Sequence, residues 1–139
     1  MALLKNRSRF DTFLEKAVEL GVQEVVPLVT ARTERERFKE TRAHNILVAA
    51  MKQSQRSRLV DLAEPAAFED GLAVGGFDLS ILCHEQAGPE AHVLSVLAGA
   101  PAARRLRIWI GPEGGFTDDE VEAARRAGFR LASLGPRRL

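Results

Sequence analysis

Short apolar runs, separated by helical patterns, constrain the fold of this chain most strongly. Three runs are nearly continuous: "VVPLV" at 25–29, "SILC" at 80–83 and "IWI" at 108–110. Strands buried on both faces have this composition because neither face meets water. The alternation of such strands with helices predicts an α/β fold, with a mostly parallel sheet and helices on both faces.

The periodicity and the capping signals also predict the individual elements. We expect strands at about 23–28, 79–83, 106–110 and 130–134 to share one sheet, with a further short strand in "RLVDLAE". The two leucines of "MALLKN" are compatible with a strand already under way. Helices are expected at about 9–20, 39–57 and 89–98, with a brief one from Pro65 and a capped one after Thr117.

Length and composition favour one domain spanning 1–139 and a cytoplasmic location. A chain of 139 residues has the size of an ordinary domain and contains no linker-like tract. No apolar run approaches the roughly 18 residues of a membrane helix, and no signal peptide is recognisable. The single cysteine, Cys83, excludes an internal disulfide and is interpreted as a small buried apolar residue.

A glycine-rich stretch follows the apolar run at 108–110. Gly111-Pro112-Glu113-Gly114-Gly115 precedes a capping box that joins Thr117 to Glu120. In open α/β sheets, ligands bind beyond the carboxyl ends of strands, so this stretch is a candidate ligand loop. A phosphate-binding loop is disfavoured, because the Gly-Lys-Ser/Thr ending is absent and Glu113 would repel a phosphate. Two interpretations stay open: a turn that needs positive φ, or a backbone that approaches a cofactor.

The motif "IGPEGGFTDDEV", followed by "SLGPRRL", resembles the RsmE family, which methylates N3 of a uridine in 16S ribosomal RNA. "EKAVELG", "ARTER", "MKQSQRSRL" and "LCHE" are similar to further segments of that family. The resemblance implies a SPOUT-type trefoil knot, S-adenosylmethionine held by three loops, a homodimeric parent and an N-terminal barrel of the PUA type. The family continues beyond "LGPRRL", so we expect a domain truncated at both ends, with the C-terminal knot segment and the cofactor site incomplete.

The resemblance also implies roles for individual residues. Ile110 and Leu134 would pack against the adenine, and Arg137 would contact the substrate as the candidate catalytic residue. Glu113 would orient the methionine amino group or the loop; the alternative is a carboxylate that binds free N–H groups at a helix entry. The complete set of implied cofactor contacts is Leu82, His84, Glu85, Ile110, Gly111, Pro112, Glu113, Gly114, Gly115, Leu134, Gly135 and Leu139.

Arginine is the preferred cation, with 16 arginines against 4 lysines, although the formal net charge is only +1. Arginine pairs with phosphate and stacks on bases, so the bias suits RNA, although codon usage in a GC-rich genome is the preferred explanation. The histidines, His44, His84 and His92, do not have metal-ligand spacing, so no metal is expected. The candidate RNA contacts are Arg32, Arg35 and Arg37, with a solvated surface as the alternative, and Arg56, with ordinary helix-end polarity as the alternative.

Two functions stay open from the sequence. The first is methylation of 16S ribosomal RNA, with the small ribosomal subunit as partner. The second is a non-catalytic α/β module that binds RNA or a partner protein. The apolar stripe of Phe10, Phe13, Leu14 and Ala17 is compatible with a core position or with the dimer interface that the resemblance implies.

Overall fold

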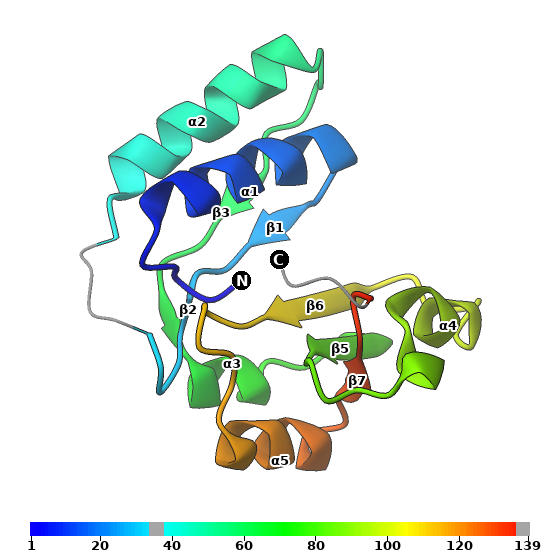
Figure 1. Ribbon diagram of the computed structural model, residues 1–139. Coiled ribbons are helices and arrows are strands. Elements are labelled where there is room, and N and C mark those ends of the chain that lie inside the picture. The colour runs from blue at the N-terminus through cyan, green and yellow to red at the C-terminus, as the bar shows by residue number, and fades with distance from the viewer. Residues whose placement is uncertain (34–37, 136–139) are drawn as a thin grey trace.

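The computed structural model describes residues 1–33 and 38–135 and has an α/β architecture (Figure 1). None of its described helices combines the length and apolar character that crossing a membrane demands. The elements, in chain order, are α1 (Arg7–Leu20), β1 (Glu24–Val25), β2 (Leu28–Val29), α2 (Glu40–Gln53), β3 (Asp61–Leu62), β4 (Ala66–Ala67), α3 (Phe68–Ala73), β5 (Leu79–Cys83), η1 (Pro89–Ala91), α4 (Val93–Ala98), β6 (Leu106–Ile110), α5 (Asp118–Arg126) and β7 (Arg130–Ala132).

A parallel sheet with strand order β6-β5-β7 forms the centre of the described structure. Successive side chains of a strand alternate between the two faces, so each face has its own core. Leu79, Ile81 and Cys83 of β5 pack with apolar residues of α4 on one face. Leu82 and Trp109 pack with residues of α3 and α5 on the other. The predicted α/β fold with helices on both faces is therefore confirmed.

The strand predicted at 23–28 does not belong to this central sheet, and that prediction was wrong. It is divided into β1, which pairs with β3, and β2, which pairs with β4. Pro27 lies between the two and has no N–H group to continue a ladder. Residues 1–3 connect β2 to the central sheet. The Leu3 N–H donates to the Leu28 carbonyl at 3.0 Å, and the Ala2 N–H donates to the Ile110 carbonyl at 2.8 Å.

Helices α1 and α2 pack together as a layer over β1 and β3 (Figure 1). Phe10, Leu14 and Ala17 of α1 are buried in this layer, so most of the predicted apolar stripe is core. Gly21 ends α1 in the left-handed conformation, with φ of +77°, as its position predicts. The ion pair between Lys16 and Glu19 on the exposed side of α1 has an N–O distance of 2.8 Å.

Three other predicted boundaries need correction. α2 ends at Gln53 instead of 57, because Gln55 adopts positive φ, while the Ser54 hydroxyl bonds to the Ala50 carbonyl in the last turn. The helix expected from Pro65 begins only at Phe68, after β4 has paired with β2. The helix expected at 89–98 is interrupted at His92, whose extended backbone lets its Nδ1 accept a hydrogen bond from Leu94 N–H and cap α4.

Candidate cofactor site at the carboxyl ends of the strands

Three of the predicted loops leave the central sheet at the same edge. Cys83 at the end of β5 pairs with Ile110 on one side and with Ala132 on the other. The His84 N–H donates to the Ala132 carbonyl at 2.9 Å and ties two of the loops together. Parallel strands in register therefore bring together segments that are about 25 residues apart in the chain, as the sequence predicted.

The glycines of the 111–115 loop have neighbours within the protein. Gly115 has φ of +70°, and its N–H donates to the Pro112 carbonyl at 2.8 Å, which closes a tight turn. A Cβ at Gly111 would lie 3.2 Å from the Phe116 ring, and one at Gly114 would lie 3.3 Å from Cδ of Arg32. The turn interpretation thus accounts for Gly115, and close internal packing accounts for Gly111 and Gly114.

Arg32 binds this loop from a distant part of the sequence. Its Nη1 donates to the Gly114 carbonyl at 2.5 Å and more weakly to the Phe116 carbonyl at 3.4 Å. The neighbouring Ala31 N–H donates to the carboxylate of Glu120 at 2.8 Å. Arg32 and Glu120 together form what we call the loop clamp. The sequence led us to expect Arg32 at RNA, and nothing local indicated its contact with the loop.

Glu120 belongs to the loop clamp and to the predicted capping box. Its carboxylate accepts hydrogen bonds from both the N–H and the hydroxyl of Thr117, and the Glu120 N–H donates back to the Thr117 hydroxyl. Only 6% of Glu120 is exposed, and each carboxylate oxygen has a donor. The capping box is confirmed, and one carboxylate links the start of α5 to the end of β2.

Glu113 is bound at the entry of α1. Its carboxylate oxygens accept hydrogen bonds from the N–H groups of Asn6, at 3.2 Å, and Lys5, at 3.3 Å. Partial burial is the largest single influence and raises the pKa of Glu113. Backbone N–H groups of Glu113, Asn6 and Lys5, together with the charge of Arg9, outweigh it and leave the pKa lowered. These contacts favour the helix-entry interpretation, although the helix is α1 and not the α5 that follows the loop.

The other predicted cofactor contacts differ in exposure. The side chain of Leu82 is fully buried against the α3 and α5 face, so only its backbone is available to a ligand. Ile110 is half-buried and Leu134 is 40% exposed, which leaves apolar surface at the ends of β6 and β7. His84 accepts a hydrogen bond from the Gln86 N–H through Nδ1, and Glu85 beside it is exposed.

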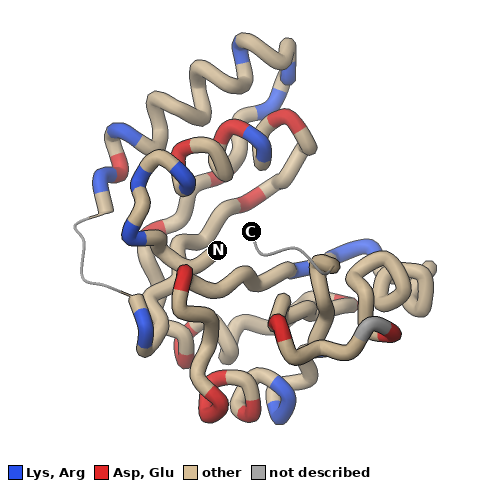
Figure 2. Tube along the Cα trace, in the orientation of Figure 1, with Lys and Arg blue, Asp and Glu red and all other residues tan. Residues whose placement is uncertain are grey.

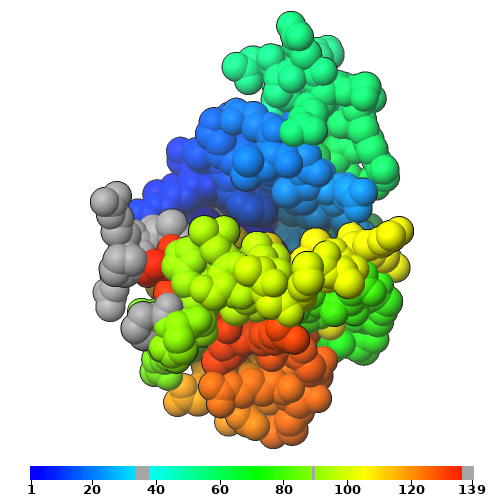
Figure 3. Space-filling model, turned by 90° about the vertical axis from the view of Figure 1, so that its right-hand side faces the viewer, coloured from blue at the N-terminus to red at the C-terminus, as the bar shows by residue number. Residues whose placement is uncertain are grey.

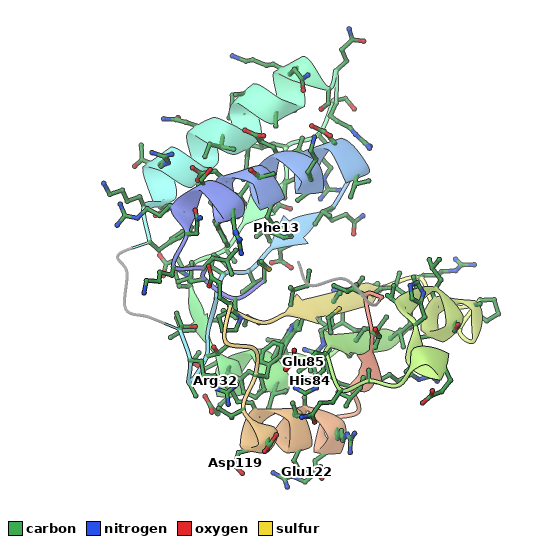
Figure 4. The ribbon with its side chains drawn as sticks, viewed as in Figure 1. Phe13, Arg32, His84, Glu85, Asp119 and Glu122 are labelled. Carbon is green, nitrogen blue, oxygen red and sulfur yellow. The ribbon has the colours of Figure 1, made fainter. Side chains whose placement is uncertain are left out.

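Figure 4 places His84 and Glu85 above α5, on the side of the helix that faces the sheet. Asp119 and Glu122 point away from it into solvent. Gly135 adopts a φ of +107°, which glycine tolerates and other residues rarely adopt. Four predicted site residues lie outside the described residues: Arg35, Arg37, Arg137 and Leu139.

Arg56 and Cys83 have contacts that explain them without a ligand. The Arg56 guanidinium donates to the Glu19 carbonyl at the end of α1 and so caps that helix. Cys83 is buried, and burial raises the pKa of its thiol to about 11, so it remains protonated at neutral pH, as expected of a buried apolar residue. Within the described residues, no group of His, Cys, Asp and Glu is arranged to hold a metal ion.

A model of the RNA methyltransferase domain matches residues 1–139. The chain belongs to this family. Its curated relatives include the ribosomal RNA small subunit methyltransferase E of Synechocystis sp., which is 32% identical. The alignment covers 96% of this chain and 45% of the relative. The corresponding enzyme of Mesomycoplasma hyopneumoniae is 29% identical, covering 99% of this chain and 60% of the relative. The chain thus spans about half the length of the curated relatives it matches.

Solved structures of similar proteins support the same family. The methyltransferase E of Neisseria gonorrhoeae, crystallised with S-adenosylmethionine, has a TM-score of 0.85 at 25% identity over 99% of this chain and 56% of that chain. A Legionella pneumophila protein with the same bound cofactor has a TM-score of 0.82 at 27% identity over 100% of this chain and 57% of that chain. The resemblance drawn from the glycine motif is therefore confirmed. Incompleteness of the knot stays a prediction, because 136–139 lie outside the described residues.

Proposed function

We propose that the protein containing this domain transfers a methyl group from S-adenosylmethionine to N3 of a uridine in 16S ribosomal RNA. The observation that carries the proposal is the family match over residues 1–139, with the glycine loop at the carboxyl ends of the central strands. Two similar structures contain the same cofactor, and two curated relatives act on small-subunit ribosomal RNA by name.

The residues present fit this cofactor. Ile110 and Leu134 offer apolar surface to a flat adenine ring, while loops 84–85, 111–115 and 133–135 offer backbone groups at one edge. The Arg32 and Glu120 clamp fixes the middle loop before any ligand arrives, which reduces the ordering cost of binding. When bound, S-adenosylmethionine supplies an electrophilic methyl group.

The remaining chemistry belongs to the protein. Neutral uracil N3 is a poor nucleophile, so its proton must leave and the resulting negative charge must be stabilised. We assign charge stabilisation to Arg137, following the family resemblance. Glu113 is not our choice as base, because its carboxylate accepts hydrogen bonds from the start of α1 and its pKa is lowered. Holding the two reactants in line supplies much of the acceleration.

The proposed partner is the small ribosomal subunit, and the proposed location is the cytoplasm. RNA contact is assigned to Arg32, Arg35, Arg37 and Arg56. Arg32 and Arg56 are exposed while they bond to backbone carbonyls, so their remaining donors can still meet phosphate. A homodimer is proposed from the family resemblance. Because Phe10, Leu14 and Ala17 are core, an interface on α1 would use its outer face, where Leu20 is 80% exposed.

The test is transfer of labelled methyl groups to small ribosomal subunits that lack the modification. We expect label in 16S ribosomal RNA and 3-methyluridine after digestion to nucleosides and mass spectrometry, with strongly reduced product for Arg137→Ala. Cofactor affinity is measured separately, by calorimetric titration. If the protein binds RNA but neither transfers methyl groups nor binds S-adenosylmethionine, the result supports the non-catalytic alternative instead.

A further inference from the structure

A cavity of about 410 Å³ lies at the amino-terminal ends of the central strands, opposite the edge with the glycine loop. The segment before β5, the start of β6 and the turn between α5 and β7 enclose it. Figure 3 shows the green segment before β5 and the yellow segment before β6 side by side above α5. We call this cavity the basal groove; the residues that carry the argument are Gly75, Gly76, Phe77, Ser80, Arg107 and Gly128.

Arg107 is the best-ordered cation of the basal groove. Its Nε donates to the Ser80 hydroxyl at 2.7 Å, and its Nη1 donates to the carbonyls of Gly71 and Val74, each at 2.9 Å. The guanidinium carbon also lies 4.3 Å from the Phe129 ring centre and 4.8 Å from that of Phe77. Hydrogen bonds and aromatic rings thus hold a half-buried cation in one orientation.

In the described part of the chain, Arg107 has no anionic partner, and two of its N–H donors have no acceptor. All three acceptors are neutral oxygens, and no carboxylate forms an ion pair with this guanidinium there. A guanidinium has five N–H donors, and the three bonds use Nε and Nη1. The two N–H groups of Nη2 are left for a ligand. An anion would neutralise a cation whose orientation is already determined, so little ordering cost would remain.

The backbone beside Arg107 is also open to a ligand. The N–H groups of Gly75, Gly76 and Phe77 donate to no acceptor among residues 1–33 and 38–135. A Cβ placed at Gly75 or at Gly128 would meet no atom within 4 Å. Unpaired N–H groups near a fixed cation are the donors that phosphate oxygens accept.

The surrounding charges favour an anion. Arg105 lies beside the groove with Arg107, since its Nη1 is 3.0 Å from the position of a Cβ at Gly76, and Arg104 adjoins it; Figure 2 shows the blue segment at the start of β6. Arg130 is in register with Ile81, so its side chain lies on the α4 face of the sheet and not beside Arg107. Asp78 is the acidic residue in the lining, and its Oδ2 accepts hydrogen bonds from the N–H groups of Arg104 and Arg105, each at 2.8 Å. The negative charge of Asp78 therefore faces these backbone N–H groups, and the arginines around the groove outnumber this carboxylate.

We propose that the basal groove binds a phosphate group of the RNA strand, at a second contact point remote from the methyl-transfer site. The inference rests on the proposed RNA substrate. A phosphodiester matches the free donors of Arg107, and Arg105 beside it on the half-buried Phe77 ring adds a second positive charge.

The test combines two measurements with a short oligouridylate as probe. Arg105→Gln removes an exposed cation of the groove, and Arg107→Gln removes the central one; Arg58→Gln, on the distant β3 side, is the control with the same change in charge. Each lost phosphate contact should reduce the slope of log affinity against log salt by about 0.7. Arg58→Gln should leave the slope unchanged. In the wild-type protein, the probe should shift the amide resonances of Gly75, Gly76 and Gly128.

The outcomes separate this inference from the proposed function. If RNA binds the wild-type protein without shifting the three glycine amides, and the salt slope of Arg105→Gln equals that of the wild-type protein, the basal groove proposal is overturned and methyl transfer is untouched. A wild-type protein that binds no RNA overturns both. Because Arg105 is exposed and its side chain makes no hydrogen bond or ion pair in the described part of the chain, the Arg105→Gln result stands even if Arg107→Gln fails to fold.

Discussion

Arg32 donates a hydrogen bond to a loop 82 residues away, so its removal should affect that loop more than the fold. Arg32→Ala deletes the charge-assisted hydrogen bonds to the Gly114 and Phe116 carbonyls. We expect about tenfold weaker binding of S-adenosylmethionine, since such bonds contribute about 1.5–3 kcal/mol and part of that is lost to loop reordering. Calorimetric titration measures the change. Arg58→Ala is the control, and equal affinity in wild-type protein and Arg32→Ala would show that the clamp does not shape the site.

Glu113 should make stability depend on acid pH. Its pKa in the folded protein is lowered from the ordinary value of 4.5, so its contribution is present above that value and is lost as the pH falls through the folded pKa. Glu113→Gln should therefore lower the melting temperature at neutral pH, and the difference from the wild-type protein should shrink in acid. Melting temperatures of Glu113→Gln and the wild-type protein, measured from neutral pH to below pH 4.5, test this expectation. Glu122→Gln, which changes an exposed carboxylate of α5, should show no such convergence.

The residues of the site were predictable only in part. The loop at 111–115 stands out because its glycines and the capping signal at Thr117 are local in sequence. The partners of the loop do not stand out: Arg32, Glu120 and Asn6 meet it or its neighbours only after the chain has folded back on itself. Arg32 was consequently assigned to RNA, although its observed contacts are the loop carbonyls.

At the scale of single elements, the contribution of the α5 cap to the free energy of unfolding can be measured with a single substitution. Thr117→Ala removes the side-chain acceptor for the Glu120 N–H, and this should lower the free energy of unfolding by about 1 kcal/mol. Urea denaturation measures the loss. Thr12→Ala on the exposed side of α1 is the matched control, because that hydroxyl bonds only to the Ser8 carbonyl within the same helix. Equal losses in the two variants would contradict a special role for the cap.

Elements with strong local signals were predicted close to their observed bounds. β5 and β6 have continuous apolar runs, and α1 and α5 have a clear stop or cap. The strand predicted at 23–28 failed because pairing is decided by tertiary neighbours: Pro27 interrupts the ladder, and residues 1–3 lie between β2 and β6. Periodicity contains no information about that insertion.

At the scale of the whole molecule, residues 1–3 join the α1–α2 layer to the central sheet. Ala2 is fully buried between β2 and β6, and its N–H donates to Ile110. Ala2→Asp would bury an unpaired carboxylate, and we expect a loss of several kcal/mol, on the order of 3 or more. Chemical denaturation checks this, with Ala102→Asp in an exposed loop as the control. Comparable stabilities of the two variants would show that the junction tolerates charge.

The long-range contacts of the glycine loop have a consequence for folding kinetics. Hydrogen bonds from Lys5, Asn6 and Arg32 reach the loop across 108, 107 and 82 residues of chain. Closing such large loops has an entropic cost that must be met before these contacts form, and chains dominated by distant contacts fold slowly. The helices and the central strands can therefore assemble while the loop is still without its final shape. Competence to bind a ligand should be acquired late in folding, after most of the secondary structure has formed.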